Sequence, residues 1–327
     1  NAVVIVVVGR FSGSQALAAV GSTTALINVF TNLFIGISLG ANVLAARFFA
    51  AGKDREMSET VHTSITLALI SGVIMAFVGL FFSRGALELM ATPSDVIDQS
   101  ALYMKIYFLG MPFFMLYNYG AAILRAVGDT KRPLIFLIIS GSVNAVLNMI
   151  LVIVFHLDVA GVAIATVISQ MISCILVLRC LYRSEGSYQL RFSRLMINKT
   201  YLKQIFQVGI PAGIQSTVIN FSNVLLQSSV NSFGSTAMAG YTAANNIFGF
   251  LYVAVNSVTQ ACMSFTSQNY GVRKYKRMDK VLIDCIIISM TTSLVLGCSA
   301  YFFGPEILKI YTKDSEVIHC GMEILAY

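Results

Sequence analysis

The sequence is poor in charge and in the residues that build metal sites. Charged residues make up 11% of the 327 residues, against about 25% in soluble domains, so an ordinary soluble domain is excluded. The chain has no tryptophan and only three histidines. This leaves little material for a histidine metal site or for tryptophan anchors at a membrane interface. The 22 phenylalanines and 14 tyrosines can serve at that interface instead.

Catalytic motifs are also missing, so we expect neither an enzyme nor a bound cofactor. The chain has no P-loop, no H-E-x-x-H and no convincing catalytic histidine partner. Gly36–Gly40 matches G-x-S-x-G, but the hydrolase elbow needs a strand–turn–helix context. Within an apolar run the same residues indicate a small-residue face for helix packing. The six cysteines form no C-x-x-C pair, which favours packed thiols over a metal site or a disulfide.

Apolar residues are abundant and lie in long runs. They make up 57% of the chain, and a membrane-spanning helix needs about 20 of them in succession. A remnant of a helix at 1–8 precedes the complete runs, and another helix begins near 317. We predict an all-α membrane protein with about eight complete spans and partial first and tenth helices. The complete spans are 26–46, 61–82, 101–124, 134–155, 159–180, 205–230, 238–265 and 281–303.

The basic residues are unevenly distributed between the connections. Of the 22 lysines and arginines, 17 lie in every second connection along the chain. The positive-inside rule places those connections in the cytoplasm and predicts a multi-pass protein of the plasma or inner membrane. The net charge of +7 therefore reflects orientation in the membrane, and we expect no nucleic-acid partner.

The second half of the sequence repeats features of the first at an offset of about 220 residues. Six predicted helices separate equivalent positions, so the two copies point the same way, as in a parallel repeat of a transporter. The matching segments are Gly13–Ala18 with Gly234–Ala239, Gly52–Arg55 with Gly271–Lys274, and Thr92–Ile97 with Thr312–Ile318.

The repeat predicts two six-helix lobes. Residues 1–181 form the N-lobe, 182–204 a polar, basic cytoplasmic linker, and 205–327 an incomplete C-lobe. Two complete lobes need about 440 residues. We therefore expect the sequence to lack most of a first helix and the helices after the start of the tenth.

One polar run follows the predicted helix 101–124. It reads Arg125-Ala-Val-Gly128-Asp129-Thr130-Lys-Arg-Pro133. Gly128 allows a tight turn, Asp129 and Thr130 can cap the next helix, and Pro133 suits its first turn.

This R-x-x-G-D-T-x-x-P run resembles a hallmark of the multidrug and toxic compound extrusion (MATE) transporters, a family of the MOP flippase superfamily. The resemblance covers the whole chain. It implies twelve helices in two lobes around a central cleft, and proton- or sodium-coupled export of cationic or amphipathic small molecules. Further segments that resemble the family are Val8–Arg10, Ala16–Gly21, Gly161–Thr166 and Gly209–Gly213.

Polar residues inside the predicted spans are candidates for a binding site, because they are costly in a membrane. Asn144 and Asn148 lie four residues apart, on one face of the predicted helix 134–155. The resemblance implies that these two, with Thr166 and with Tyr103 nearby, line a cation-binding pocket in the N-lobe. The alternative is that they join helices by hydrogen bonds. The same alternative holds for polar residues of the C-lobe, among which Gln215 and Asn256 are cavity candidates.

The chain departs from the family at the acidic positions. Val4 and Asn148 stand where the family or some of its members have acids, and no glutamate lies near Ile219 and Asn220. Asp284 is the acid placed furthest into a predicted span, and we expect it to face the membrane interface. Coupling of export to an ion would then use another group or a residue of later helices, or the protein is impaired in transport.

Two alternatives to a multidrug antiporter remain open. One is a flippase for lipid-linked oligosaccharides, whose cavity should carry basic residues for a pyrophosphate. Lys105 lies within a predicted span but near its outer end, where it can snorkel to the interface. The other is a non-transporting or decayed membrane protein. For a transporter, the expected partners are small molecules and membrane lipids.

Overall fold

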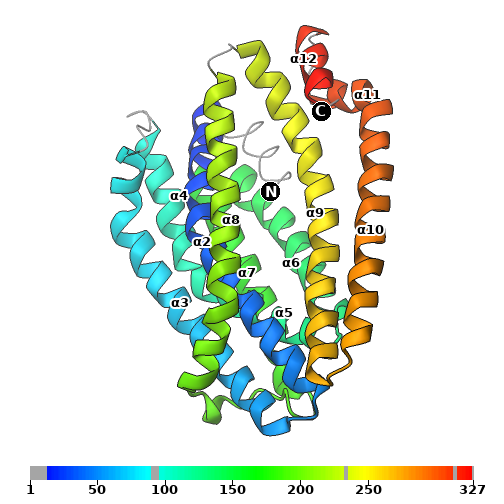
Figure 1. Ribbon diagram of the computed structural model, residues 1–327. Coiled ribbons are helices and arrows are strands. Elements are labelled where there is room, and N and C mark those ends of the chain that lie inside the picture. The colour runs from blue at the N-terminus through cyan, green and yellow to red at the C-terminus, as the bar shows by residue number, and fades with distance from the viewer. Residues whose placement is uncertain (1–12, 90–95, 232–234, 312–314, 326–327) are drawn as a thin grey trace. The chain divides into compact units, whose positions relative to one another are not determined.

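The computed structural model describes residues 13–89, 96–231, 235–311 and 315–325, and their regular structure is helical throughout (Figure 1). The chain divides into two compact units, Asn1–Thr217 and Val218–Tyr327. The predicted lobe boundaries remain a prediction. In unit 1, the connection after Arg183 and the first part of α8 pack with the preceding helices.

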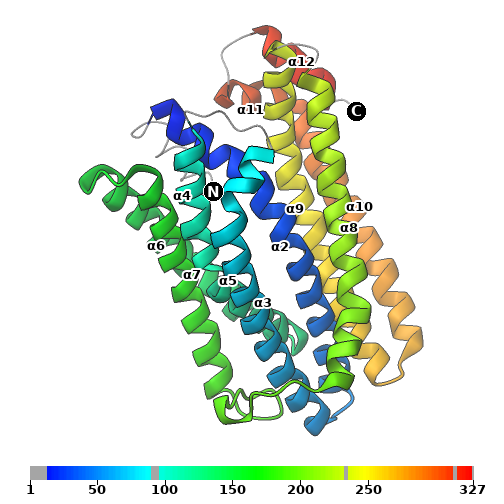
Figure 2. The ribbon, with the colours of Figure 1, turned by 90° about the vertical axis from the view of Figure 1, so that its left-hand side faces the viewer.

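Unit 1 is built from long helices that pack around an apolar core (Figure 2). Its largest fully buried side chains include Tyr119 and Phe108. The elements are α2 (Gly13–Ala50), α3 (Asp54–Leu89), α4 (Ile97–Leu109), α5 (Met111–Ala126), α6 (Lys131–Met149), the π-helical turn η1 (Ile150–Val154), α7 (Asp158–Arg183), the 3-10 turn η2 (Phe192–Arg194) and the first part of α8 (Lys199–Asn231).

Unit 2 is smaller and has its own apolar cluster around Ile247, Ala300 and Leu308. It consists of the rest of α8, then α9 (Ser235–Gly271), α10 (Tyr275–Phe302), α11 (Gly304–Tyr311) and α12 (Ser315–Leu325). In the described part of this unit, α9 packs against both α10 and α12.

Most of the predicted spans are confirmed. Six described helices are long and apolar enough to cross a membrane, and the bent pair α4–α5 makes a seventh. The eighth predicted span is the helix α8, whose 33 residues include Gln207, Gln215 and Asn220. These polar side chains explain why α8 does not meet the same test of apolarity.

The predicted single helix 101–124 is wrong, because the structure has two helices there that meet at 47°. The break falls at Gly110, and Pro112 lies in the first turn of α5. Proline has no N–H to continue the hydrogen bonds of α4. A side chain at Gly110 would collide with Gln170 and Val167 of α7, so the bend brings α4 close to α7.

Helices α2 and α8 cross at four glycines, which confirms the predicted packing face. A Cβ atom on Gly36 would overlap the backbone of Gly213, and one on Gly40 would overlap the carbonyl of Ile205. Gly209 meets the backbone of α2 at Ile37. The two backbones can approach this closely because neither helix has side chains at the crossing.

The two copies of the repeat end their second predicted helix in the same way. Gly52 follows α2 with φ of 65°, and Arg273 follows α9 with φ of 57°. In each case the residue after it donates its N–H to a carbonyl five residues earlier: Lys53 to Phe48, and Lys274 to Asn269. This left-handed cap recurs at the predicted offset of about 220 residues.

Candidate functional site

Two asparagines and a serine form a polar cluster between α6 and α7. Asn148 Nδ2 donates to Asn144 Oδ1 at 3.0 Å and to the Asn144 carbonyl at 2.9 Å. Asn144 Nδ2 donates to Ser169 Oγ at 3.4 Å, and Ser169 Oγ donates to the Thr166 carbonyl at 2.7 Å. The two amides thus share one face of α6, as their spacing predicts.

Asn148 keeps one oxygen without a donor. Its side chain is fully buried, and Oδ1 has no hydrogen-bond partner among the described residues. A buried acceptor left unsatisfied costs about 1–3 kcal/mol. Such a group calls for an explanation, and an ion that completes its coordination is one.

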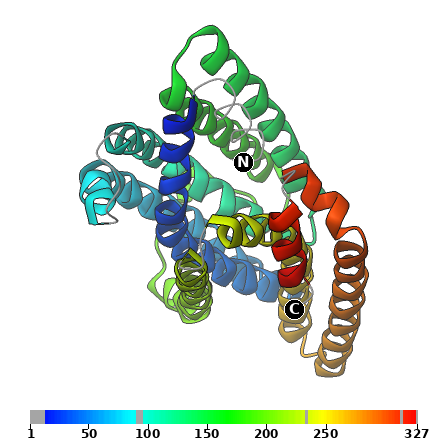
Figure 3. The same cartoon turned by 90° about the horizontal axis from the view of Figure 1, so that it is seen from above.

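The backbone next to Asn148 is irregular. Helix α6 ends at Met149 and continues as the π-helical turn η1, the green segment at the top of Figure 3 that joins α6 to α7. Short π-helical turns of this kind are frequent at functional sites.

The cluster contains no acid. The described residues of α6 include no Asp or Glu, and the one acid of α7 is Asp158, an exposed residue in the first turn of that helix. No group of three or more potential metal ligands of the His, Cys, Asp and Glu type lies within the described ranges. The arrangement can therefore offer neutral amide, hydroxyl and carbonyl oxygens, which bind hard cations.

Two further predicted residues, Thr166 and Tyr103, do not join the cluster through their side chains. Thr166 Oγ1 donates to the Val162 carbonyl of its own helix at 2.9 Å. Tyr103 is buried on α4 and stacks on Tyr107, with ring centroids 6.0 Å apart. In the described structure no hydrogen bond joins either side chain to the asparagines. Ser169 was missed from sequence, although it lies one turn beyond Thr166 on the same face of α7.

The candidates from the second half do not form a site in the structure. Gln215 is exposed on α8 in unit 1, and Asn256 is half-buried on α9 in unit 2. Asp284 is exposed on α10, and its place at the membrane interface remains a prediction. Their roles in a cavity remain predictions.

The signature run forms the turn between α5 and α6. Gly128 has φ of 90°, which confirms the predicted tight turn. Asp129 Oδ1 accepts the N–H of Arg132 at 3.1 Å, so the predicted capping by Asp129 is confirmed. Thr130 occupies the N-cap position but its side chain makes no cap bond, so that part of the prediction is wrong. Pro133 lies in the first turn of α6, and its carbonyl accepts the Tyr117 hydroxyl at 3.1 Å.

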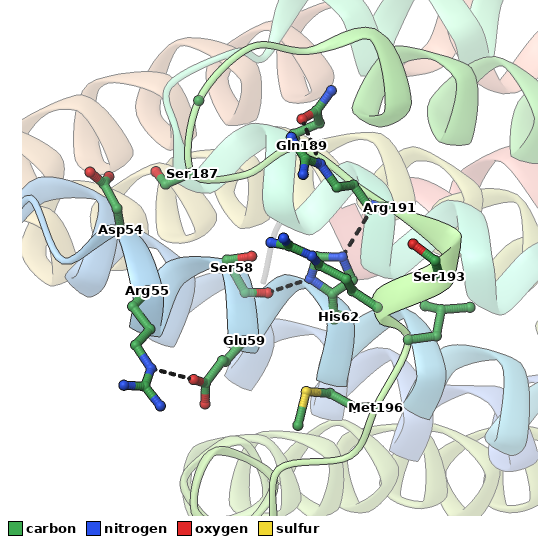
Figure 4. A pocket seen from close by; sticks show the side chains of 13 residues that line it. Asp54, Arg55, Ser58, Glu59, His62, Ser187, Gln189, Arg191, Ser193 and Met196 are labelled. Carbon is green, nitrogen blue, oxygen red and sulfur yellow. Dashed lines mark hydrogen bonds and ion pairs between the residues drawn. The ribbon is translucent and has the colours of Figure 1, made fainter.

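The connection from α7 to α8 is attached to the start of α3. His62 Nδ1 donates to the Ser58 carbonyl at 2.6 Å, and His62 Nε2 accepts the Arg191 N–H at 3.1 Å (Figure 4). Asn198 donates to Glu59 at 2.7 Å. These bonds place two of the basic connections at one end of unit 1, as the alternating charge predicts.

A pocket of about 800 Å³ opens beside this attachment, between α3 and the connection. Its walls carry both signs of charge: Arg55 pairs with Glu59 at 2.9 Å, while Arg191 and Arg194 come from the connection. The pocket lies at the end of the helices rather than within the spans, so we do not assign transport to it.

A bundle of apolar helices with a buried, neutral polar cluster defines a multi-pass integral membrane protein of the plasma membrane. Residues 1–150 and 211–327 match the model of the MatE family. The chain belongs to this family, which confirms the resemblance seen in the sequence.

Relatives and a solved structure agree with this assignment. The chain is 30% identical to the probable multidrug resistance protein YoeA of Bacillus subtilis, over 97% of this chain and 70% of that protein. It is 24% identical to the multidrug export protein MepA of Staphylococcus aureus, again over 97% and 70%. A multidrug resistance MATE family transporter in an outward-facing conformation superposes with a TM-score of 0.89 at 21% identity, over 98% of this chain and 72% of that one. That likeness shows the shared fold.

Proposed function

We propose that this protein exports cationic or amphipathic small molecules by antiport, and that a cation bound at the Asn144–Asn148–Ser169 cluster drives the export. The names of the relatives YoeA and MepA support multidrug export. The unsatisfied, fully buried oxygen of Asn148 is the observation that carries the assignment of the cation site.

Sodium fits this cluster better than a proton does. Amide and hydroxyl groups do not take up a proton near neutral pH, whereas their oxygens can coordinate a metal cation. Proton coupling needs a group that titrates in the working range. The one acid in the described residues of α6 and α7 is Asp158, which is exposed in the first turn of α7.

A neutral cluster also fits a cationic substrate better than a pyrophosphate. A flippase for lipid-linked sugars would need basic side chains in its cavity, at membrane depth. Lys105 is exposed on α4, where its long side chain can reach the membrane surface. Export by alternating access then follows if sodium and drug favour different states of the protein.

The cation site is tested by thermal unfolding of the purified chain in sodium, potassium and choline chloride at equal ionic strength. A ligand that binds only the folded state raises the unfolding temperature. We expect sodium to do so, and Asn148→Leu to abolish the sodium-specific rise.

Ser140→Ala is the matched control, because Ser140 is a buried residue of the same helix whose hydroxyl donates to Leu137. This variant should keep the full response to sodium. Equal shifts in sodium and potassium, or a sodium response that survives Asn148→Leu, would overturn the assignment.

A further inference from the structure

A second groove of unit 1, of about 670 Å³, lies where α6 begins and α7 ends. Arg132 contributes from the first turn of α6, and Arg179 and Arg183 from the last turns of α7. Arg132 Nη1 lies 3.5 Å from Cys180 Sγ, so the two helix ends are in contact. This is the end of the helices that the distribution of basic residues assigns to the cytoplasm.

The groove has an excess of positive charge. Arg179 and Arg183 are exposed and lie one helical turn apart on the same face, an arrangement in which like charges repel. Neither has an ion-pair partner within the described part of the chain, whereas Arg132 pairs with Asp129 at 3.3 Å. Glu185 is the acid that lines the groove, so two guanidinium groups face one carboxylate.

The other side of the groove is apolar. Phe136 and Leu176 line it, one from each helix. Next to them Ile135 and Ile175 are 50% and 54% exposed, on helices that are long and apolar enough to cross the membrane. A free phosphate would use only the arginines, whereas a phospholipid would use the arginines and this apolar face together.

We infer that this groove binds an anionic phospholipid of the cytoplasmic leaflet. The phosphate of the headgroup lies between Arg179, Arg183 and Arg132, and the acyl chains follow the apolar faces of α6 and α7. Basic pockets between membrane helices on the cytoplasmic side bind anionic headgroups in this way. Arginine suits the role because its planar group can make two hydrogen bonds to one phosphate.

The absence of tryptophan permits a direct measurement. Ile175→Trp places a single tryptophan on the exposed face of α7 beside the groove, without changing a residue that lines it. The full chain is reconstituted in lipid bilayers. Brominated phosphatidylglycerol and brominated phosphatidylcholine are then compared as quenchers of the tryptophan fluorescence. We expect phosphatidylglycerol to occupy the groove in clear preference to phosphatidylcholine.

Removal of the two unpaired charges should abolish this preference. In Arg179→Gln/Arg183→Gln we expect binding of phosphatidylglycerol to weaken about 30-fold, since each arginine near a membrane surface contributes roughly a fivefold factor. Arg179→Lys/Arg183→Lys keeps the charge and should keep most of the preference. Both positions are exposed, so these variants should fold.

The matched control removes two positive charges from another cytoplasmic connection, in Arg273→Gln/Lys274→Gln. It should leave the preference within about twofold of the parent, because neither residue lines the groove. If Arg179→Gln/Arg183→Gln and Arg273→Gln/Lys274→Gln lost the preference for phosphatidylglycerol equally, general surface charge would explain the preference. Competition by glycerol 1-phosphate would show a site for free phosphate. Either result would overturn the inference.

Discussion

At the scale of single residues, the proposed cation site depends on Asn148. Its amide cannot titrate, so sodium binding should be insensitive to pH between about 6 and 8. In Asn148→Asp the site gains a carboxyl group, which can take up a proton, whereas the amide cannot. Protonation of this acid would compete with sodium binding. We therefore expect the sodium-dependent rise in unfolding temperature to weaken as the pH falls, only in this variant.

The same thermal measurement at a series of pH values checks this prediction, with the parent chain as its control. A parent response that itself disappears at low pH would show that a titrating group elsewhere controls the site. If the sodium-dependent rise in the unfolding temperature of Asn148→Asp did not change with pH, residue 148 would lie outside the sodium site.

Arg273 is a second informative residue, because it adopts the left-handed conformation that its repeat counterpart Gly52 adopts without strain. A non-glycine residue there costs roughly 1–2 kcal/mol. We expect Arg273→Gly to stabilise the folded protein by about 1 kcal/mol, and Gly52→Ala to destabilise it by a similar amount. Chemical unfolding in mixed micelles measures both. If Arg273→Gly destabilised the protein, the side chain of Arg273 would contribute more to the free energy of unfolding than the backbone strain costs.

At the scale of helices, the crossing of α2 and α8 depends on backbone contact. Gly36→Ala inserts a methyl group against the backbone of Gly213, and overpacking of this kind typically costs 1–3 kcal/mol. Gly141→Ala is the control, since a Cβ on Gly141 of α6 would meet nothing within 4 Å. Alanine is the better helix former by roughly 1 kcal/mol. Thermal unfolding should therefore show a lower midpoint for the first variant and a higher one for the second.

The helices could be predicted from sequence where one simple pattern dominates. Long apolar runs predicted the spans, and the alternation of basic connections predicted the shared end of unit 1. The bend at Gly110 was missed, although Pro112 two residues later is a signal for it. Nothing in the sequence predicts the π-helical turn after Asn148, because its residues 150–154 are all apolar.

Only the part of the candidate site that lies on one helix could be predicted from sequence. The spacing of Asn144 and Asn148 fixes their common face on one helix. The contact with Ser169 depends on how α7 is rotated against α6, and spacing within one helix carries no information about that. Asp129 caps α6 while Thr130 does not, since the cap depends on backbone angles at the turn rather than on residue type.

At the scale of the whole molecule, the central claim is that a neutral cation site drives drug export. The site lies within unit 1, and the chain covers 70% of the length of YoeA. The claim requires that a sodium gradient alone moves a drug, without a proton gradient. It also requires that export depends on Asn148.

The most direct measurement is ethidium export by the chain reconstituted in proteoliposomes, under an imposed sodium gradient with the proton gradient collapsed by an ionophore. The account predicts export that follows the sodium gradient, stops when that gradient is removed, and is lost in Asn148→Leu but kept in Ser140→Ala. Export driven by a proton gradient alone, and unchanged in Asn148→Leu, would contradict it.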